Sequence, residues 1–265
     1  MAMNYYFISP HLDDAIFSAG NLIYKLREKA KVTIITIFTK VTNESNTLFT
    51  HLFIKKSGFC NSRDLFSARK DEDIKVCRSI GVNAIHLDFV DLAWRKKRAV
   101  GGISLRIPEL SHLYPTRFHI LGGKIHKEDE AIMKKITQTL KNSIKNDDAV
   151  VFCPLGIGNQ VDHIITRTIC QKSFLNVIYW QDYPYVLKNQ ADQRFIKENN
   201  LETMTFCGPF YKKELMLGYT SQIQAYFKDK KIKNVTEHYY SSSPFCKRSL
   251  LNDFSKRSRE SLGNK

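Results

Sequence analysis

Short apolar runs alternate along the chain with segments in which apolar residues recur at every third or fourth position. The runs are rich in aromatic and β-branched residues, so we predict buried strands at 5–8, 32–38, 84–89, 149–153 and 176–180. Helical spacing, with Ser67 as one expected N-cap, predicts helices at 14–28, 67–80, 127–146, 161–173 and 211–227. This alternation predicts an α/β protein with a Rossmann-like, doubly wound, mostly parallel sheet that carries helices on both faces.

The segments between these elements are less regular. Residues 40–65 show no clear period, which predicts a long loop or a short helical excursion. Residues 92–126 are expected to be mostly loop, and 204–206 form a candidate sixth strand at the sheet edge. Neither a repeat nor a linker divides the chain, so we predict one domain over residues 1–265 with a basic tail from about 245.

Side chains that can bind a metal follow two of the predicted strands. His11, Asp13 and Asp14 come directly after the first strand, and His163 follows the strand at 149–153 through a glycine-rich turn. In a doubly wound sheet, ligands bind outside the carboxyl ends of the strands, so the fold places both groups at one edge. One histidine and one aspartate of the first group plus His163 would supply three ligands and leave a fourth position open, as in a catalytic zinc site.

Each of these residues also has a purely structural interpretation. Asp13 or Asp14 alone is a suitable N-cap for the helix that follows, and Asp162 could cap the helix that carries His163. His11 alone could be a hydrogen-bonded histidine of the core. The joint occurrence of these residues after two strands favours a metal site over the separate roles.

The chain is basic, with 41 Lys and Arg against 26 Asp and Glu and a formal net charge of +15. This charge favours anionic partners such as a phosphorylated or carboxylated substrate, and residues 94–98 are a candidate phosphate-binding loop. A basic surface without a specific partner would give the same net charge. No helix-turn-helix, zinc-finger or RNP-like pattern is present, which disfavours a specific nucleic-acid partner.

Cysteine usage and hydropathy indicate the compartment. The six cysteines are scattered singly, without a disulfide framework or a paired thiolate motif. No stretch approaches the roughly 20 apolar residues of a membrane span. We therefore expect a soluble, cytoplasmic protein.

The chain resembles the LmbE-like (PIG-L) N-deacetylases, zinc hydrolases that act on N-acetylglucosaminyl and related N-acyl groups. Residues 11–15, HLDDA, are similar to the first motif of that family, and residues 158–163, GNQVDH, are similar to the second. Similarity also covers 69–73, 87–95 and 179–185, and more faintly 219–222, so the resemblance spans nearly the whole chain. It implies a single LmbE-like deacetylase domain and a small-molecule or glycoconjugate substrate.

Carried over by position, the resemblance implies a Zn²⁺ ion held by His11, Asp14 and His163, with Asp13 as general base. It also implies a set of residues that touch the substrate or order its pocket, namely Arg69, Asp91 and Asn159. For Arg69 and Asp91 the alternative is a surface ion pair, which is common and mostly weak.

One position departs from the family pattern. The second family motif begins with a histidine that is partnered by an aspartate two residues on; this chain has Gln160 there, with Asp162 in the partner position. Gln160 can donate an amide N–H to an oxyanion, but it cannot carry a proton to a leaving amine. Three outcomes stay open: a slower enzyme in which Asp13 moves both protons, a different proton donor, or a protein that binds without turnover.

The expected function is zinc-dependent removal of an N-acetyl group from an N-acetylglucosamine-type sugar or glycoconjugate. Asp13 would act on the attacking water, and Gln160 and Asp162 would complete the catalytic group. The main alternative is a carbohydrate-binding or regulatory member of the same fold. A zinc hydrolase that cuts an ester or a different amide is also compatible with these residues.

Overall fold

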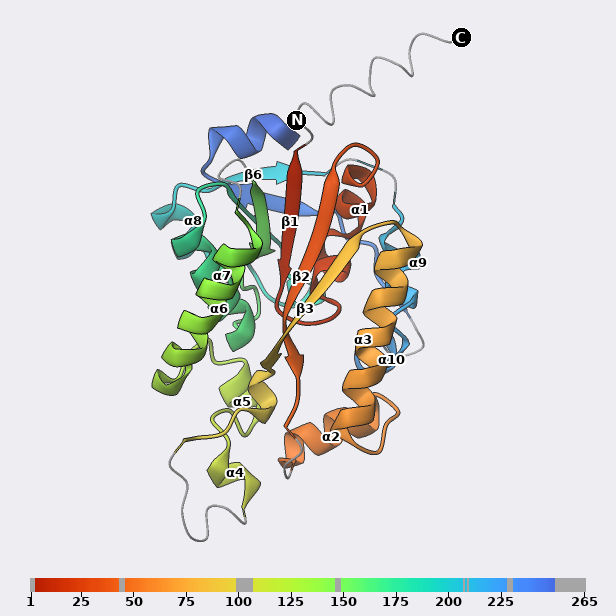
Figure 1. Cartoon of the computed structure of the whole chain (residues 1–265), viewed down its shortest axis with the longest axis vertical. Helices are drawn as coiled ribbons and strands as arrows, with labels where there is room; N and C mark the ends of the chain where they lie inside the picture. Colours follow the sequence, from red (N-terminus) through yellow and green to blue (C-terminus); the bar gives the residue numbers. More distant parts are fainter. Residues whose placement is uncertain are drawn as a thin grey trace.

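The computed structural model describes residues 3–42, 46–98, 107–145, 149–206, 208, 210–227 and 231–250. Strands from these residues form one seven-stranded sheet in the order β3-β2-β1-β4-β5-β7-β6 (Figure 1). They are β1 (Asn4–Ser9), β2 (Lys31–Lys40), β3 (Asn83–Val90), β4 (Val150–Pro154), β5 (Val177–Trp180), β6 (Glu202–Thr205) and β7 (His238–Ser241). β1 to β5 pair in parallel, whereas β7 runs antiparallel to β5 and β6. The predicted α/β fold with a mostly parallel sheet is confirmed.

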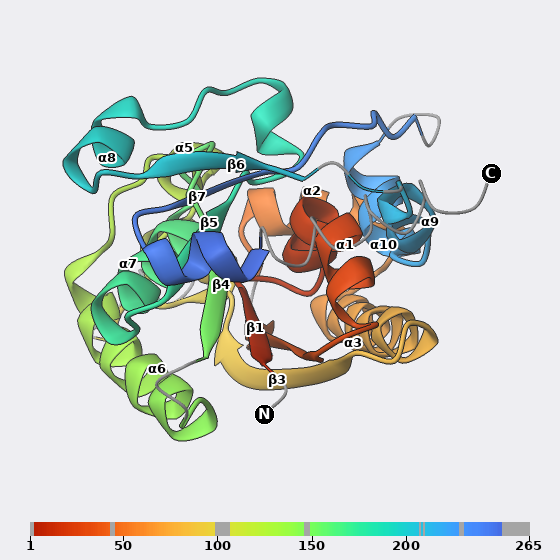
Figure 2. The same cartoon turned by 90° about the horizontal axis from the view of Figure 1, so that it is seen from above.

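Helices cover both faces of this sheet, as the view from above shows (Figure 2). α1 and α3 contact β1, β2 and β3 from one face, and α7 contacts β4 and β5 from the other, with α6 beside it. No helix within the described ranges is both long and apolar enough to span a membrane. The helices are α1 (Asp14–Leu26), α2 (Leu48–Lys56), α3 (Ser62–Ser79), α4 (Pro108–Ser111), α5 (Arg117–Ile120), α6 (Glu130–Ser143), α7 (Val161–Ser173), α8 (Gln193–Glu198), α9 (Lys212–Leu217) and α10 (Thr220–Tyr226).

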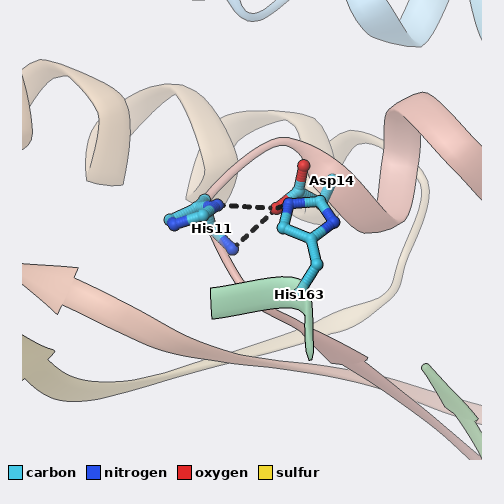
Figure 3. A group of neighbouring side chains, drawn as sticks. All are labelled: His11, Asp14 and His163. Atoms are coloured by element: carbon cyan, nitrogen blue, oxygen red, sulfur yellow. Dashed lines mark hydrogen bonds and ion pairs between the residues drawn. The ribbon is translucent and has the colours of Figure 1, made fainter. Parts of the chain in front are cut away.

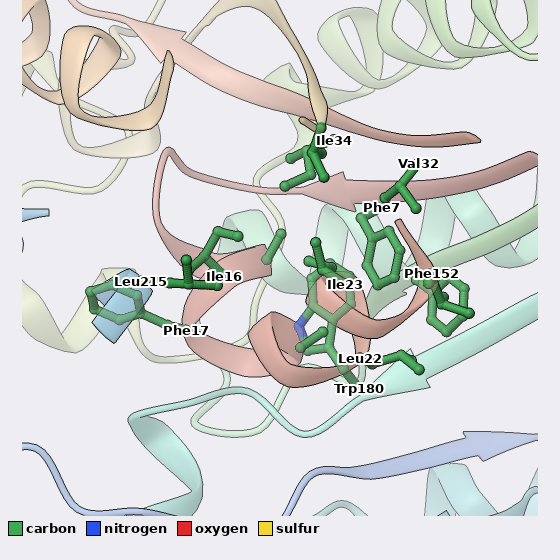
Figure 4. Close-up of a cluster of buried hydrophobic side chains, with 14 of the residues drawn as sticks. Phe7, Ile16, Phe17, Leu22, Ile23, Val32, Ile34, Phe152, Trp180 and Leu215 are labelled. Atoms are coloured by element: carbon green, nitrogen blue, oxygen red, sulfur yellow. The ribbon is translucent and has the colours of Figure 1, made fainter. Parts of the chain in front are cut away.

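An apolar core between α1 and the central strands holds β1 and β4 together (Figure 4). Phe7 of β1 stacks on Phe152 of β4 with ring centroids 4.2 Å apart, and Leu22 and Ile23 of α1 belong to the same buried cluster. Strands that are buried on both faces need continuous apolar sequences, which is why these runs are visible in the sequence. The packing fixes the carboxyl ends of β1 and β4 side by side.

One helix begins earlier than the sequence predicts. α3 begins at Ser62 rather than at Ser67, because the side chain of Asn61 accepts a hydrogen bond from the backbone N–H of Asp64 at 2.9 Å. The expectation that Ser67 caps this helix is therefore wrong. The first turn is polar and gives no apolar period, so the pattern becomes recognisable only further along.

The segment 211–227 forms two helices instead of one. α9 ends at Leu217, and α10 begins at Thr220. Between them the chain passes so close to α3 that a Cβ atom on Gly218 would lie 2.3 Å from Val76. This close approach, which periodicity cannot reveal, accompanies the interruption.

The antiparallel edge of the sheet contains a strand that the sequence pattern does not reveal. The expected sixth strand at 204–206 is β6, and the unpredicted β7 lies between it and β5. In the expected irregular segment 40–65, α2 is the short helical excursion. Of the predicted tail from about 245, residues up to 250 are helical, and 251–265 lie outside the described residues.

Candidate metal centre

Two turns at neighbouring strand ends supply the candidate ligands. His11, Asp13 and Asp14 lie where β1 leads into α1, and His163 lies in the first turn of α7, after β4. β1 and β4 are paired in parallel, so both turns leave the sheet at the same edge. The convergence that the sequence predicted from this topology is therefore present in the structure.

The carboxylate of Asp14 lies between the two histidine rings (Figure 3). Its Oδ2 is 2.9 Å from Nδ1 of His11 and 3.2 Å from Nε2 of His163. The candidate ligand atoms of the three residues all lie within 4.8 Å of one another, and all three residues are buried. The backbone N–H of His11 also donates to Asp14 Oδ2 at 2.9 Å, which holds the carboxylate in the turn.

These side chains fit a zinc ion. Two imidazole nitrogens and a carboxylate oxygen are donors that zinc binds. Nε2 of His163 is buried, and besides its 3.2 Å contact with the Asp14 carboxylate it makes no hydrogen bond among the described residues, so a metal would meet no other partner at this atom. His11 also lies within 4.8 Å of Asp91 and Asp162 as a second possible group, but the Asp162 carboxylate is already bonded by Arg95. The group with Asp14 is therefore the better metal site.

Asp182 orients His163 from the side opposite the candidate metal. Oδ1 of Asp182 lies 2.6 Å from Nδ1 of His163, and its Oδ2 accepts backbone hydrogen bonds from Gly156 and Ile157, each at 2.8 Å. A carboxylate at Nδ1 favours the proton on that nitrogen and leaves the Nε2 lone pair for a metal. The glycine-rich turn and the ligand histidine are thus anchored by one buried acid.

The charges around the group favour a cation. Burial alone would lower the pKa of His163, but Asp14 and Asp182 raise it to about 9. Burial opposes ionisation of Asp14, yet His163 and His11 hold its pKa well below the usual range. Burial also lowers the pKa of His11, and its hydrogen bonds with Asp14 and Asp162 outweigh this and raise it well above the usual value. A metal ion can replace the protons in such a field.

Asp13 is adjacent to Asp14 but has a different partner. Its Oδ1 accepts a hydrogen bond from Nη2 of Arg69 at 2.9 Å, and both side chains are buried. Burial and the charge of Asp14 raise the pKa of Asp13 to about 6, against the opposing charges of Arg69 and His11. Asp13 stands at the N-cap position of α1 without a side-chain capping bond, so the capping interpretation is wrong. The surface ion pair that was the alternative for Arg69 is also wrong.

Asp162 belongs to a buried network rather than to a helix cap. Arg95 contacts Asp162 Oδ1, while Oδ2 accepts the backbone N–H of Leu92 at 3.1 Å and lies 3.3 Å from Nε2 of His11. Burial opposes ionisation of Asp162, and Arg95 with His11 lowers its pKa below the usual value. Oδ2 of Asp91 lies 3.6 Å from the same His11 nitrogen.

Gln160 performs the capping that the sequence allowed for Asp162. Its Oε1 accepts backbone hydrogen bonds from Asp162 at 2.6 Å and His163 at 3.2 Å, at the start of α7. Because the oxygen is engaged, the amide nitrogen is directed towards the site, 3.4 Å from Nε2 of His11. Gln160 can therefore present N–H groups near the candidate metal, and the cap fixes their direction.

Asn159 stands apart from the other predicted site residues. It is exposed and occupies a left-handed backbone position with φ of 56°, in the turn closed by its own N–H to Gly156. No described hydrogen bond joins its side chain to the metal group, and its contact with substrate stays a prediction. Arg69 and Asp91, by contrast, lie beside the group.

Two functional candidates received no role from the sequence. Asp182 follows β5 by two residues, just as His11 follows β1, so the rule of polar residues at strand ends could have found it. Arg95 was part of a basic segment that suggested a phosphate-binding loop, but its guanidinium is buried between Asp162 and Asp129. The resemblance to the family includes position 95, but charge and periodicity alone do not distinguish this buried arginine from the basic residues that follow it.

A parallel α/β sheet with a buried His-Asp-His group at its carboxyl edge defines a candidate metalloprotein. Residues 6–173 match the model of the PIG-L family, described as GlcNAc-PI de-N-acetylase. The chain belongs to this family of deacetylases. A comparison with curated proteins finds no match to the chain.

Solved structures support the same fold. A deacetylase of the teicoplanin biosynthesis pathway, solved in complex with bog, aligns with a TM-score of 0.69 and 18% identity over 90% of this chain and 97% of that chain. A zinc-inhibited form of teicoplanin deacetylase Orf2 aligns with a TM-score of 0.68 and 17% identity over 90% of this chain and 97% of that chain. The A40926 pseudoaglycone deacetylase Dbv21 aligns with a TM-score of 0.64 and 19% identity over 91% of this chain and 97% of that chain. At this identity the similarity shows the fold alone.

Proposed function

We propose that the protein is a zinc-dependent N-deacetylase that removes an acetyl group from an N-acetylglucosamine-type sugar or glycoconjugate. The observation that carries this proposal is the buried convergence of His11, Asp14 and His163, with the separate carboxylate of Asp13 beside them. Membership of the PIG-L family supports the reaction class. The same family membership supports an N-acetylated sugar as the substrate class.

In the proposed mechanism, a bound zinc ion would supply a Lewis acid that makes water more acidic and stabilises charge on a carbonyl oxygen. Asp13 accepts a proton from the attacking water and returns it to the nitrogen as the C–N bond breaks. Arg69 holds the carboxylate of Asp13 in place through Oδ1. Asp182 keeps His163 in the tautomer that leaves its Nε2 lone pair available.

Gln160 acts on the carbonyl oxygen in this proposal rather than on the leaving amine. Its amide nitrogen faces the site because its oxygen is bound by the start of α7. An amide N–H stabilises a developing oxyanion when it points at that atom. The proton for the amine then comes from Asp13, which is the only one of these two side chains that can release one at neutral pH.

The test combines metal analysis with an amine-release assay on N-acetylated sugars. Asp13→Asn should retain zinc at the wild-type level and lose about 10²–10⁴-fold in rate, the typical contribution of a general base. His163→Ala should lose both zinc and activity. The exposed Asp71 provides a control, since Asp71→Asn makes the same chemical change away from the site. Unchanged turnover in Asp13→Asn would exclude Asp13 as the base.

The departure at position 160 supports a second candidate, a carbohydrate-binding or regulatory member of the same fold. Gln160 is committed to a structural cap and cannot transfer a proton. This candidate predicts that the wild type binds zinc and N-acetylated sugars but releases no amine. The same assay, run beside equilibrium sugar binding, separates it from the enzyme.

A further inference from the structure

A cavity of about 410 Å³ lies beside α6, at the ends of β2 and β3. Its walls come from the end of β2 at Lys40, the end of β3 at Phe89, the segment 94–98 and α6 at Lys135. Neither the histidines nor Asp13 and Asp14 line it. This volume is within the range of small-molecule binding sites.

The lining carries more cationic than acidic side chains, namely Lys40, Arg95, Lys96, Arg98 and Lys135 against Asp88, Glu128 and Asp129. The side chains of Lys40, Arg98 and Lys135 have no ion pair in the part of the chain that the structure describes. Asp88 and Asp129 are paired with cations, whereas Glu128 accepts a neutral backbone N–H and keeps its negative charge. Asp88 pairs with Lys70 at 2.5 Å, Glu128 accepts the backbone N–H of Arg98 at 2.7 Å, and Asp129 lies 3.0 Å from Arg95. The net field in the cavity therefore favours an anion.

A buried guanidinium forms part of the same wall. Arg95 is 5% exposed, its Nε donates to the carbonyl of Val90 at 3.0 Å, and its Nη2 contacts Asp162. Its Nη1 lies 3.0 Å from Oδ2 of Asp129, so two carboxylates hold the guanidinium in the wall of the cavity. Asp162 contacts both Arg95 and His11, since its Oδ2 lies 3.3 Å from Nε2 of His11. The cavity wall and the candidate metal centre therefore share this carboxylate.

We propose that this cavity binds a small molecule that carries a phosphate or carboxylate group. The side-chain cations of Lys40, Arg98 and Lys135 would receive the anionic group. The apolar side chains of Trp94, Phe89 and Leu113 would cover the uncharged part of the same molecule. The inference goes beyond deacetylation, because it assigns a second site whose occupancy is measurable without turnover.

Isothermal titration calorimetry with inorganic phosphate as the probe tests the site in the intact protein. Lys135→Glu should weaken phosphate binding by about fivefold or more, because it reverses one charge of the lining. The matched control is Lys134→Glu, since Lys134 precedes it on α6, is exposed and does not line the cavity. The control should change the Kd less than twofold. Absence of phosphate binding to the wild type, or an equal loss in both variants, would overturn the proposal.

Kinetics then distinguish the two sources of the anion. If the anionic group belongs to the substrate, Lys135→Glu raises the KM for N-acetylglucosamine 6-phosphate and leaves the KM for N-acetylglucosamine unchanged. If it belongs to a separate molecule, added phosphate changes the rate on the neutral sugar, and Lys135→Glu removes that response. A wild type that deacetylates neither sugar would contradict only the proposed function, since calorimetry decides the cavity independently.

Discussion

Two adjacent carboxylates acquire different properties from their neighbours. Asp14 lies between His11 and His163, which lower its pKa, whereas Asp13 lies against Arg69 and keeps a pKa raised to about 6 by burial and by the charge of Asp14. The sequence shows the pair of acids, but it cannot show which way each side chain points. That direction is decided by contacts with His11 in the same turn, with Arg69 of α3 and with His163 of α7.

The role of Asp182 gives the first prediction at this scale. Asp182→Asn removes the charge that orients His163, and loss of such a partner typically weakens metal affinity by about 10–100-fold. Zinc titration against a competing chelator measures the change. Asp192→Asn is the matched control, since Asp192 also accepts backbone hydrogen bonds but at the start of α8, away from any ligand. Equal zinc affinity in the two variants would contradict the orienting role.

Gln160 gives the second prediction. Gln160→His places an imidazole beside Asp162 and adds a group that can carry a proton, so kcat/KM for an N-acetylated sugar should stay unchanged or rise. Gln160→Ala is the comparison that removes both the amide and the cap, and it should lower the free energy of unfolding by about 1 kcal/mol. A fall in kcat/KM for the histidine variant, at unchanged stability, would show that an imidazole cannot replace the amide N–H at this position.

Elements with a strong apolar pattern were predictable, and elements defined by contacts were not. α7 has the predicted bounds, since its apolar face packs on β4 and β5. β7 has only four residues with polar ones at both ends, and it is a strand because β5 and β6 pair with it. The start of α3 depends on the capping side chain of Asn61 rather than on periodicity. The same distinction separates the metal ligands, which follow strands, from Arg95, which the fold buries.

The turn between β4 and α7 supplies a prediction at the element scale. Gly158 has φ of 86°, and a Cβ there would lie 2.5 Å from Cδ1 of Tyr185. Gly158→Ala should therefore lower the free energy of unfolding by about 2–4 kcal/mol, from backbone strain plus overpacking. Urea denaturation measures it. Gly81→Ala has a similar φ of 66° but open space around the Cβ, so it should cost only about 1 kcal/mol. If both variants lost the same free energy of unfolding, the contact with Tyr185 would contribute nothing to the cost of Gly158→Ala.

At the scale of the whole molecule, the metal group connects segments that are about 150 positions apart in the chain. His11 precedes α1, Asp14 is the first residue of α1, and His163 lies in α7, so the ligands stay together only while the sheet is folded. A metal that binds only the folded state stabilises it by mass action. We therefore expect zinc binding at this site to raise the free energy of unfolding of the whole fold.

Thermal unfolding with and without zinc tests this coupling. At free zinc about 100 times the Kd, the stabilisation is roughly 2.7 kcal/mol. For a chain of this size, that corresponds to an increase in Tm of about 5–10 °C. His163→Ala should show no comparable increase, because it lacks one of the three ligands that the fold brings together. Lys134→Glu, which changes a charge on the outer helix α6, should respond like the wild type. An equal increase in the wild type and in His163→Ala would place the zinc elsewhere on the molecule, and the convergence of β1 and β4 would then have no role in binding it.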